Sequence, residues 1–461
     1  MSMFLLMVVI FVLGYVAIAL EHPLKIDKAA SALFIGTATW VAYIFGAFDI
    51  LGGGNSPAWE AYSATHGETG IEAMTHFIVH NQIIHHLGEI SEILFFLLGA
   101  MTIVEIVDQH QGFKIITDKI KTTNKVKLLW ILSFLTFFMS ALLDNLTTTI
   151  VMVALLRKLI DDKQTRWFFA SMVVLAANAG GAWSPIGDVT TIMLWIGGQI
   201  TALGIITNVI FPSLVTMVVP LILLSFTMKG EIKRPEIANE KDYTTAFERR
   251  LLLIMGVGGL LFVPVFKTVT HLPPYMGMLF SLSIIWITTE ILHKKKDNEN
   301  KLSVTNILSK VDVPTVLFFL GILSAVAALQ SAGQLNIMAE FLDKNLKNVY
   351  LIDLAIGILS SIVDNVPLVA GSMGMYDIAD PGAVGYAANF VVDGTFWEFL
   401  AFTAGTGGSI LIIGSAAGVA AMGLEKIDFI WYMKKISLLA LLGYLAGAGA
   451  YYLQTMIFYG V

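Results

Sequence analysis

Two short polar motifs interrupt long apolar runs of this chain. Leu143-Asp144-Asn145-Leu146 is the first, and Val363-Asp364-Asn365-Val366 follows 220 positions later. A carboxylate beside a carboxamide is costly in a membrane interior, so such residues are usually kept there for a function. Their oxygen atoms are hard ligands that suit a small cation. The repetition predicts two related halves built around a polar centre.

Each motif is followed by an apolar segment that small and polar residues interrupt. The first interruption runs from Asn178 to Asp188 and contains Pro185, and the second includes Gly405 to Ser409. Glycine weakens a helix and proline removes a hydrogen-bond donor, so both segments should unwind and expose carbonyl oxygens. The candidate ligands of a cation are then the side chains of Asp144, Asn145, Thr147, Asn178, Asp188, Thr190, Asp364, Asn365 and Ser409.

The residue types around this centre favour a cation over an anion, because three aspartates and no basic residue fall in the predicted core. Dehydration disfavours the charged form of a carboxylate, so a proton and a metal ion compete for the same oxygens. That competition is the minimal mechanism of antiport. An Asp-Asn pair could instead only cap two half-helices. For Ser184, Thr190, Thr191 and Ser409, hydrogen bonds between helices are at least as good an interpretation.

The composition is typical of an integral membrane protein. Of 461 residues, 56% are hydrophobic and only 13% are charged. The charges separate apolar segments of about 17–25 residues, which is the length that crosses a bilayer as a helix. The net charge of −6 argues against a nucleic acid partner, and the absence of cysteine excludes disulfides and thiolate metal sites. The first apolar stretch has no basic n-region and is expected to be a retained span.

The positions of lysine and arginine predict the orientation of the spans. Basic residues flank the first motif on both sides, which predicts a re-entrant hairpin at about 128–158 that opens to the cytoplasm. The second motif lies in a segment with acidic flanks, so a hairpin at about 350–374 should enter from outside. The two halves should therefore have opposite orientations, with both chain ends outside.

The predicted fold is an all-α polytopic membrane protein of two inverted repeats, 1–228 and 251–461, joined by a cytoplasmic linker at 229–250. Each repeat contains three spans, a hairpin, a broken helix and one further span. The broken helices are expected at about 167–200 and 394–423. The simple spans are expected at about 3–20, 29–48, 90–109 and 205–228, and at about 251–268, 274–292, 311–331 and 436–458.

The segment from His76 to Glu92 carries four histidines and two glutamates. Their helical spacing could build a metal site, but no matching motif occurs elsewhere in the chain. We expect an interfacial or span-entry helix near the external surface. Its histidines could sense pH between about 5 and 8.

Three motifs together resemble the NhaD-type sodium/proton antiporters of the ion transporter superfamily, which also contains arsenite and divalent-anion transporters. They are Ser140 to Thr149, Asn178 to Thr191 and Ser360 to Pro367, and the resemblance covers nearly the whole chain. It implies exchange of cytoplasmic Na⁺ or Li⁺ for external H⁺ across a bacterial inner membrane, active at alkaline pH. It also implies a homodimer in the lipid bilayer, with a scaffold and a mobile transport domain that work as an elevator.

The resemblance also implies roles for individual residues. His85 and Glu92 would respond to pH or modulate transport, and the neighbouring His86 leaves the histidine assignment open. No cofactor is implied beyond the transported ions. The implied transport residues are Asp144, Asn145, Asn178, Asp188, Thr190, Thr191, Asp364 and Asn365, with Ser360 and Ser409 as further candidates.

Two other classes of function compete with antiport. One is a superfamily transporter of another solute, either arsenite-like efflux or sodium-coupled anion symport. The anion symporters carry a Ser-Asn-Thr type hairpin tip, whereas Asp144 and Asp364 stand here and would repel a dicarboxylate. A neutral solute stays open. The other class is an intramembrane enzyme, which is disfavoured because no HExxH, Ser-Lys or Gly-Asp protease signature occurs.

Overall fold

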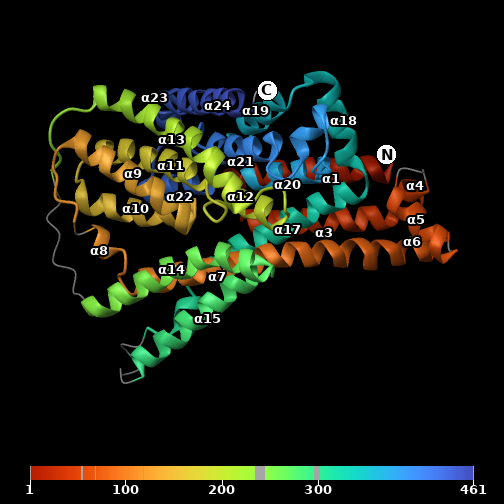
Figure 1. Ribbon diagram of the computed structural model, residues 1–461, viewed down its shortest axis with the longest axis horizontal. Coiled ribbons are helices and arrows are strands. Elements are labelled where there is room, and N and C mark those ends of the chain that lie inside the picture. Colours follow the sequence, from red (N-terminus) through yellow and green to blue (C-terminus); the bar gives the residue numbers. More distant parts are fainter. Residues whose placement is uncertain are drawn as a thin grey trace. The chain divides into compact units, whose positions relative to one another are not determined.

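The computed structural model describes residues 2–52, 56–67, 69–117, 119–233, 244–294 and 302–459. Within these ranges the chain is helical, with one isolated β-bridge and no strand (Figure 1). The all-α prediction is therefore confirmed for the described residues. Residues 234–243 of the predicted linker at 229–250 lie outside them.

Seven helices in the described part are long and apolar enough to cross a bilayer, which agrees with a multi-pass membrane protein. α24 (Ser437–Tyr459) and the preceding α23 (Phe429–Lys435) bend by 53° and count as an eighth span when taken together. α1 (Met3–Ala19) is shorter. The seven are α3 (Lys28–Phe45), the continuous helix Ile71–Gln109, α9 (Lys125–Leu143), α13 (Ala202–Thr227), α14 (Ala246–Thr270), α15 (Pro274–His293) and α17 (Val313–Ser331).

The predicted interruptions are also present. α9 and α10 (Asn145–Leu159) pack side by side, and Asp144 is the single residue that separates them in the chain (Figure 1). The remaining interrupted segments are α11 (Lys163–Gly181) with α12 (Val189–Ile196), α19 (Val349–Leu359) with α20 (Asn365–Met375), and α21 (Thr395–Gly407) with α22 (Ala416–Glu425).

The helix that carries the histidines begins earlier than the predicted residue 90. α6 (Ile71–Phe77), a π-helical segment η1 (Ile78–Ile83) and α7 (Ile84–Gln109) form one continuous helix. Its polar residues made the span look shorter than it is, but His80, His85 and Glu89 lie exposed on its surface. Short elements were not predicted: α2 (Glu21–Leu24), α4 (Ala47–Leu51), α5 (Pro57–His66), α8 (Lys114–Thr117), α16 (Val304–Leu308), α18 (Gln334–Leu346) and the 3₁₀ helix η3 (Gly385–Phe390).

The chain forms two compact units. The first contains Met1–Phe95, Asp312–Asn348 and Val366–Ile378, and the second contains Phe96–Val311, Val349–Asn365 and Ala379–Val461. Each unit combines segments from both halves of the sequence. This division therefore differs from the predicted repeats 1–228 and 251–461, which stay a prediction.

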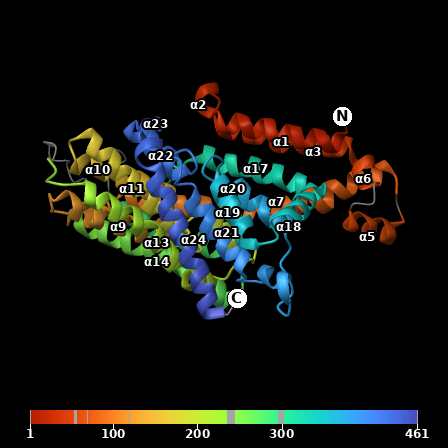
Figure 2. The ribbon, with the colours of Figure 1, turned by 90° about the horizontal axis from the view of Figure 1, so that it is seen from above.

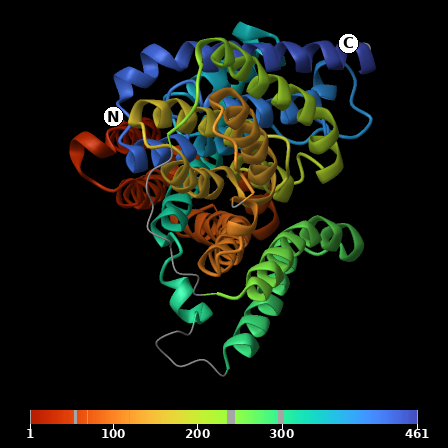
Figure 3. The same ribbon diagram turned by 90° about the vertical axis from the view of Figure 1, so that its left-hand side faces the viewer.

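Each unit is built from closely packed helix pairs. In the first unit, α3 lies along both α1 and α17 (Figure 2). The backbones of α3 and α17 meet at glycines, since a Cβ placed on Gly36 would lie only 2.5 Å from the carbonyl oxygen of Gly321. In the second unit, α9 and α10 pack on α11, α19 packs on α21, and α13 packs on α24. α14 packs on α15 (Figure 3).

The two hairpins make matching contacts with the broken helices that follow them. Ser140 donates to the carbonyl oxygen of Ala177 at 2.6 Å, and Ser360 donates to that of Ala404 at 2.8 Å. The serines are 220 positions apart and the two carbonyls are 227 positions apart, as the sequence offsets require. The two contacts have the same form, and the origin of the chain as two related halves stays a prediction. The opposite orientation of the halves stays a prediction.

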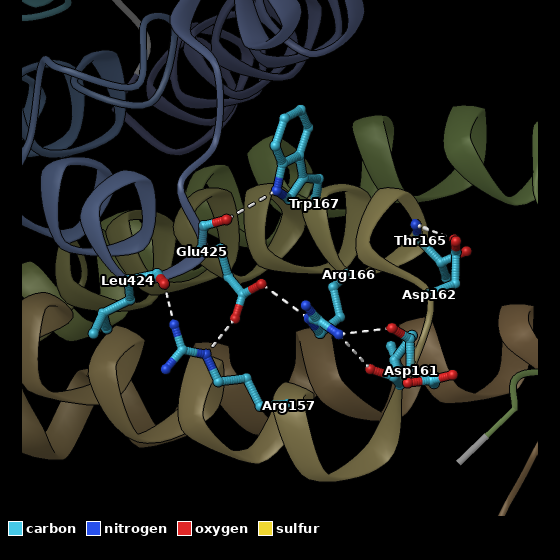
Figure 4. Close-up of polar contacts among 9 residues, drawn as sticks. Arg157, Asp161, Asp162, Thr165, Arg166, Trp167, Leu424 and Glu425 are labelled. Carbon is cyan, nitrogen blue, oxygen red and sulfur yellow. Dashed lines mark hydrogen bonds and ion pairs between the residues drawn. The ribbon is translucent and has the colours of Figure 1, made fainter. Parts of the chain in front are cut away.

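A buried carboxylate joins three helix ends in the second unit. Glu425 ends α22, and its side chain is 1% exposed. It accepts from Arg157 Nε of α10 at 2.7 Å and from Arg166 Nε of α11 at 2.9 Å (Figure 4). Trp167 Nε1 donates to the Glu425 carbonyl oxygen at 3.0 Å. The Glu425 carboxylate, paired with two arginines, therefore holds the ends of α10, α11 and α22 together.

Replacing Glu425 with glutamine should destabilise the second unit, because the guanidinium of Arg166, which is 19% exposed, loses its charged partner. The expected loss is roughly 3 kcal/mol or less, since Arg157 is half exposed and water screens it. Denaturant unfolding of the purified protein in detergent measures the loss. An unchanged unfolding midpoint would contradict the role of this contact.

Asp162→Ala is a matched control on the neighbouring helix start. Asp162 caps α11, accepting from Thr165 N at 2.7 Å, so its loss should cost about 1 kcal/mol. The side-chain and backbone donors of Thr165 lower the pKa of Asp162 below its usual range. A lowered pKa means that the contribution is present above about pH 4 and disappears as the pH falls through the folded-state value.

Candidate functional site

Asp144 is the single residue between α9 and α10. Its φ is 73° and its ψ is 162°, a region that is essentially reserved for glycine and costs other residues of order 1–3 kcal/mol. Its carboxylate caps α10, accepting from Thr147 N at 2.7 Å and from Thr147 Oγ1 at 2.9 Å. Asp144 is thus a helix cap, as the capping interpretation expects. Because strain of this kind is retained mainly at functional positions, the tip is also a candidate site.

Asp188 lies between the two halves of the first broken helix and is 1% exposed. Its Oδ1 accepts from Thr190 N and Thr190 Oγ1, both at 3.0 Å, which caps α12. Its Oδ2 faces two carboxamides, Asn145 Nδ2 at 2.6 Å and Asn365 Nδ2 at 3.5 Å. Thr191 Oγ1 donates to the Asp188 carbonyl oxygen at 2.9 Å. Both hairpin motifs therefore reach one buried carboxylate.

Asn178 extends this network into the second broken helix. The side chain is fully buried, and its Oδ1 accepts from Asn145 Nδ2 at 3.1 Å. Its Nδ2 donates to Ser409 Oγ at 2.9 Å and to Ser415 Oγ at 2.8 Å. Both ends of the amide are engaged, so Asn178 holds fixed positions for Asn145 on one side and the two serines on the other.

The carboxylates of this cluster are electrostatically coupled. Asp188 interacts with Asp144 and with Asp364. Like charges at close range cannot all be ionised without a compensating ion. The helices α10, α12 and α22 begin at the cluster. Each helix N-terminus supplies a partial positive charge that is smaller than one elementary charge. The arrangement therefore favours uptake of a cation or a proton.

The structure brings most of the predicted site residues together within the second unit. Asn145, Asn178, Asp188, Asn365 and Ser409 share hydrogen bonds, and the predicted threonines hold the two capping aspartates. Ser360 is placed differently. Its hydroxyl donates to the backbone of Ala404, which is a packing contact between α21 and the end of α19.

Two residues of the cluster were missed by the sequence argument. Ser415 caps α22 and accepts from Asn178, and it stands 227 positions after Asp188, the same offset as the other paired positions. That offset could have identified it. Tyr432 is fully buried and donates from its hydroxyl to the carbonyl oxygen of Ser409 at 2.8 Å. It lies in the short helix α23, and no motif pointed to it.

The predicted pH-response residues lie in the first unit, on α7. His86 Nε2 contacts Ser331 Oγ at 3.0 Å, and its Nδ1 contacts Glu89 at 3.1 Å. His85 contacts the same glutamate at 3.3 Å but is 67% exposed, whereas His86 is 16% exposed. Glu92 follows on the same helix. The structure thus favours His86 as the histidine with a fixed environment, while the pH response of this group stays a prediction.

A histidine metal site gains no support. In the described ranges, no three side chains of His, Cys, Asp or Glu are grouped so that they could hold a metal ion. A small alkali cation does not need three such side chains, because amide, hydroxyl and backbone oxygens also serve as its ligands. The Asp188 cluster offers oxygens of these kinds.

Comparison with known proteins gives related matches over most of the chain. A family model described as "citrate transporter" matches residues 6–391. Sodium/proton antiporter 1 of Arabidopsis thaliana is 47% identical over 449 residues, which cover 96% of this chain and 71% of that protein. Sodium/proton antiporter 2 of the same plant is 44% identical over 450 residues, with 96% and 98% covered. Na⁺/H⁺ antiporter NhaD of Alkalimonas amylolytica is 30% identical over 368 residues, with 74% and 72% covered.

Ser415→Ala should weaken Na⁺ binding about fivefold, because the Asn178 amide loses one of its two acceptors, a change worth about 1 kcal/mol. Isothermal titration of the purified protein with NaCl measures the affinity. Ser213→Ala is the matched control. Ser213 is also fully buried, but its hydroxyl has no hydrogen-bond partner among the described residues, so its loss should leave Na⁺ binding unchanged. Equal effects of the two substitutions would exclude a specific role of Ser415.

Proposed function

Because the chain belongs to the ion transporter superfamily and, within it, to the NhaD-type sodium/proton antiporters, we propose that it exchanges Na⁺ for H⁺ across a membrane. The observation that carries this proposal is the buried Asp188 carboxylate, which meets amides from both hairpin motifs and has two further carboxylates within electrostatic range. The chain acts as a transporter, and the proposal assigns it no enzymatic step.

In this proposal the cation site is built from Asp144, Asn145, Asp188, Asp364 and Asn365. The Nδ2 atoms of Asn145 and Asn365 donate to Asp188, so the carboxamide oxygens are the atoms that coordinate the cation. Na⁺ is bound by these oxygens and by carboxylate oxygens of the aspartates. The transported Na⁺ compensates the charges that repel one another when the site is deprotonated.

Protons displace Na⁺ at the same oxygens. Binding of H⁺ to Asp188 removes one negative charge and occupies an oxygen that otherwise accepts from Asn145. The neutral acid attracts Na⁺ less, so Na⁺ leaves on the side to which the site is open. Each ion therefore excludes the other without any covalent step, and the threonine contacts keep Asp144 and Asp188 in place throughout.

The finer parts of the proposal come from the family resemblance. They are efflux of cytoplasmic Na⁺ or Li⁺, activity at alkaline pH, two inverted repeats, an elevator movement and a homodimer. A bacterial inner membrane location with both chain ends outside also stays a prediction. The two Arabidopsis relatives are named as sodium/proton antiporters, which supports Na⁺ and H⁺ as the exchanged ions.

A sodium-coupled carboxylate transporter is the second candidate, because the matching family model is described as a citrate transporter. The site argues against it. Carboxylates stand at both hairpin tips, and a third, Asp188, lies between them, so a citrate or dicarboxylate anion would meet like charge.

Proteoliposomes with a dye that reports the pH gradient distinguish these candidates. NaCl, LiCl, KCl and sodium citrate are compared from about pH 7 to about pH 9.5. We expect a response to Na⁺ or Li⁺ that grows at alkaline pH and does not require citrate. Uptake of labelled citrate without proton movement would instead support anion symport.

Asp144→Asn should abolish exchange and leave folding intact, because the amide can still cap α10 but cannot bind a proton or carry a charge. Asp144→Gly should also be inactive, while glycine adopts the backbone angles of this position without strain. Dye dequenching and thermal unfolding are measured for both variants. Asp377→Asn, the same change at an exposed loop residue, is the control and should transport normally. Exchange at the wild-type rate in Asp144→Asn would refute the assignment.

A further inference from the structure

A second pair of buried carboxylates lies in the second unit, on helices outside the Asp188 hydrogen-bond network. Asp353 is on α19 and Glu398 is on α21, two helices that pack on each other. Asp353 is fully buried, and Glu398 is 3% exposed. α13, α19, α21 and α24 contain no other charged residue, so these two acids have no basic partner on those helices.

Asp353 has no hydrogen-bond partner at either carboxylate oxygen among the described residues. It is the fifth residue of α19, beyond the first turn, and so it does not act as the cap of this helix. An ionised carboxylate without partners in a buried apolar environment is very costly, and such a group takes a proton instead. The surroundings of Asp353 therefore require the neutral acid.

The carboxylate of Glu398, unlike that of Asp353, has hydrogen-bond donors around it. Its Oε1 accepts from Asn208 Nδ2 of α13 at 2.8 Å, and its Oε2 accepts from the Tyr451 hydroxyl of α24 at 3.0 Å. Gln454 Nε2 donates to the Asn208 carbonyl oxygen at 2.9 Å and holds that residue in place. A carboxylate that accepts at both oxygens has the pattern of an ionised group. The two acids thus differ in the protonation state that their environments support.

Tyr451 interacts electrostatically with both acids, Glu398 and Asp353. The other titratable groups that face Asp353 are Tyr350 on its own helix and Tyr444 on α24. Tyr350 hydrogen-bonds Thr455 at 2.9 Å, and the Tyr444 hydroxyl donates to the Leu354 carbonyl oxygen at 3.2 Å. Asp393, just before α21, interacts with Glu398. All of these neighbours are acids or phenols, so none neutralises Asp353 by ion pairing.

We propose that Asp353, with Glu398 and Tyr451 beside it, is a second proton-binding site, which takes up and releases one proton during transport. The inference rests on the proposed Na⁺/H⁺ exchange. α19 leads directly to the tip residues Asp364 and Asn365, and Asn365 contacts Asp188. Movement of this tip on Na⁺ binding therefore changes the packing around Asp353. One bound proton forms one O–H bond on its carboxylate, and release restores one negative charge.

Infrared spectroscopy of the purified protein tests the proposal without relying on transport. The C=O stretch of a protonated, buried carboxylic acid is recorded across a pH titration, with and without NaCl. We expect a wild-type band that Asp353→Asn removes and that decreases when Na⁺ is added. Asp377→Asn makes the same chemical change at an exposed residue and should leave the band unchanged.

Two results would overturn the proposal. The absence of a carboxylic acid band from the difference spectrum between the wild type and Asp353→Asn shows that Asp353 carries no proton. A difference band that changes with neither pH nor Na⁺ shows a structural proton that is never released. If Asp353→Asn does not fold, Tyr451→Phe replaces it. Removing the hydroxyl donor of Glu398 should alter the pH at which the wild-type band disappears, and no alteration would count against the shared site.

A transport measurement separates this inference from the proposed function. In proteoliposomes, Asp353→Asn should still exchange Na⁺ for H⁺ but move one proton fewer per Na⁺ than the wild type. Absence of exchange in the wild type refutes the antiport proposal, while the infrared result for Asp353 stands by itself. An unchanged H⁺/Na⁺ ratio in the variant refutes the second site and leaves antiport intact.

Discussion

The cost of placing a carboxylate in the interior of a membrane protein is the constraint on which this site depends. Asp188 meets part of that cost with hydrogen bonds from five donor atoms, four at its carboxylate and one at its own carbonyl oxygen.

 Counted by atom, the five donors are Thr190 N, Thr190 Oγ1, Asn145 Nδ2 and Asn365 Nδ2 at the carboxylate, and Thr191 Oγ1 at the carbonyl oxygen. Both oxygens of the carboxylate are engaged, yet its charge is only partly compensated, because every donor is neutral. In the proposed mechanism, the transported cation completes the compensation.

The helix interruptions follow from the same constraint. A continuous helix uses its own backbone donors, whereas α10, α12 and α22 each begin at the cluster and present unsatisfied N–H groups there. Asp144, Asp188 and Ser415 cap these starts with their side chains. The caps therefore stabilise the helix starts, and in the proposed mechanism the two capping aspartates also bind the transported ions. This explains why a strained backbone persists at Asp144, where a glycine would be easier to accommodate.

Much of this arrangement could be predicted from the sequence. The positions of the long helices follow from apolar runs, and the break at Asp144 follows from the polar pair inside such a run. The unwound segment before Asp188 follows from glycine and proline, which act locally. The hydrogen bonds between Asn178 and the two serines join segments more than 200 positions apart, and no local rule predicts which serine is reached. The π-helical stretch in the histidine segment was also missed, because the hydropathy pattern does not encode a change of helical register.

The contrast between Asp188 and Asp353 shows how one chain can give two aspartates different chemistry. Asp188 is surrounded by donors that favour a charged carboxylate, whereas Asp353 has no donor among the described residues, so this arrangement of the helices favours its neutral acid. Both sites are coupled to the second hairpin, Asp188 through Asn365 and Asp353 through α19 itself. A cation bound at the first site and a proton bound at the second therefore act on the same hairpin, which is the physical link that an exchange of the two ions requires.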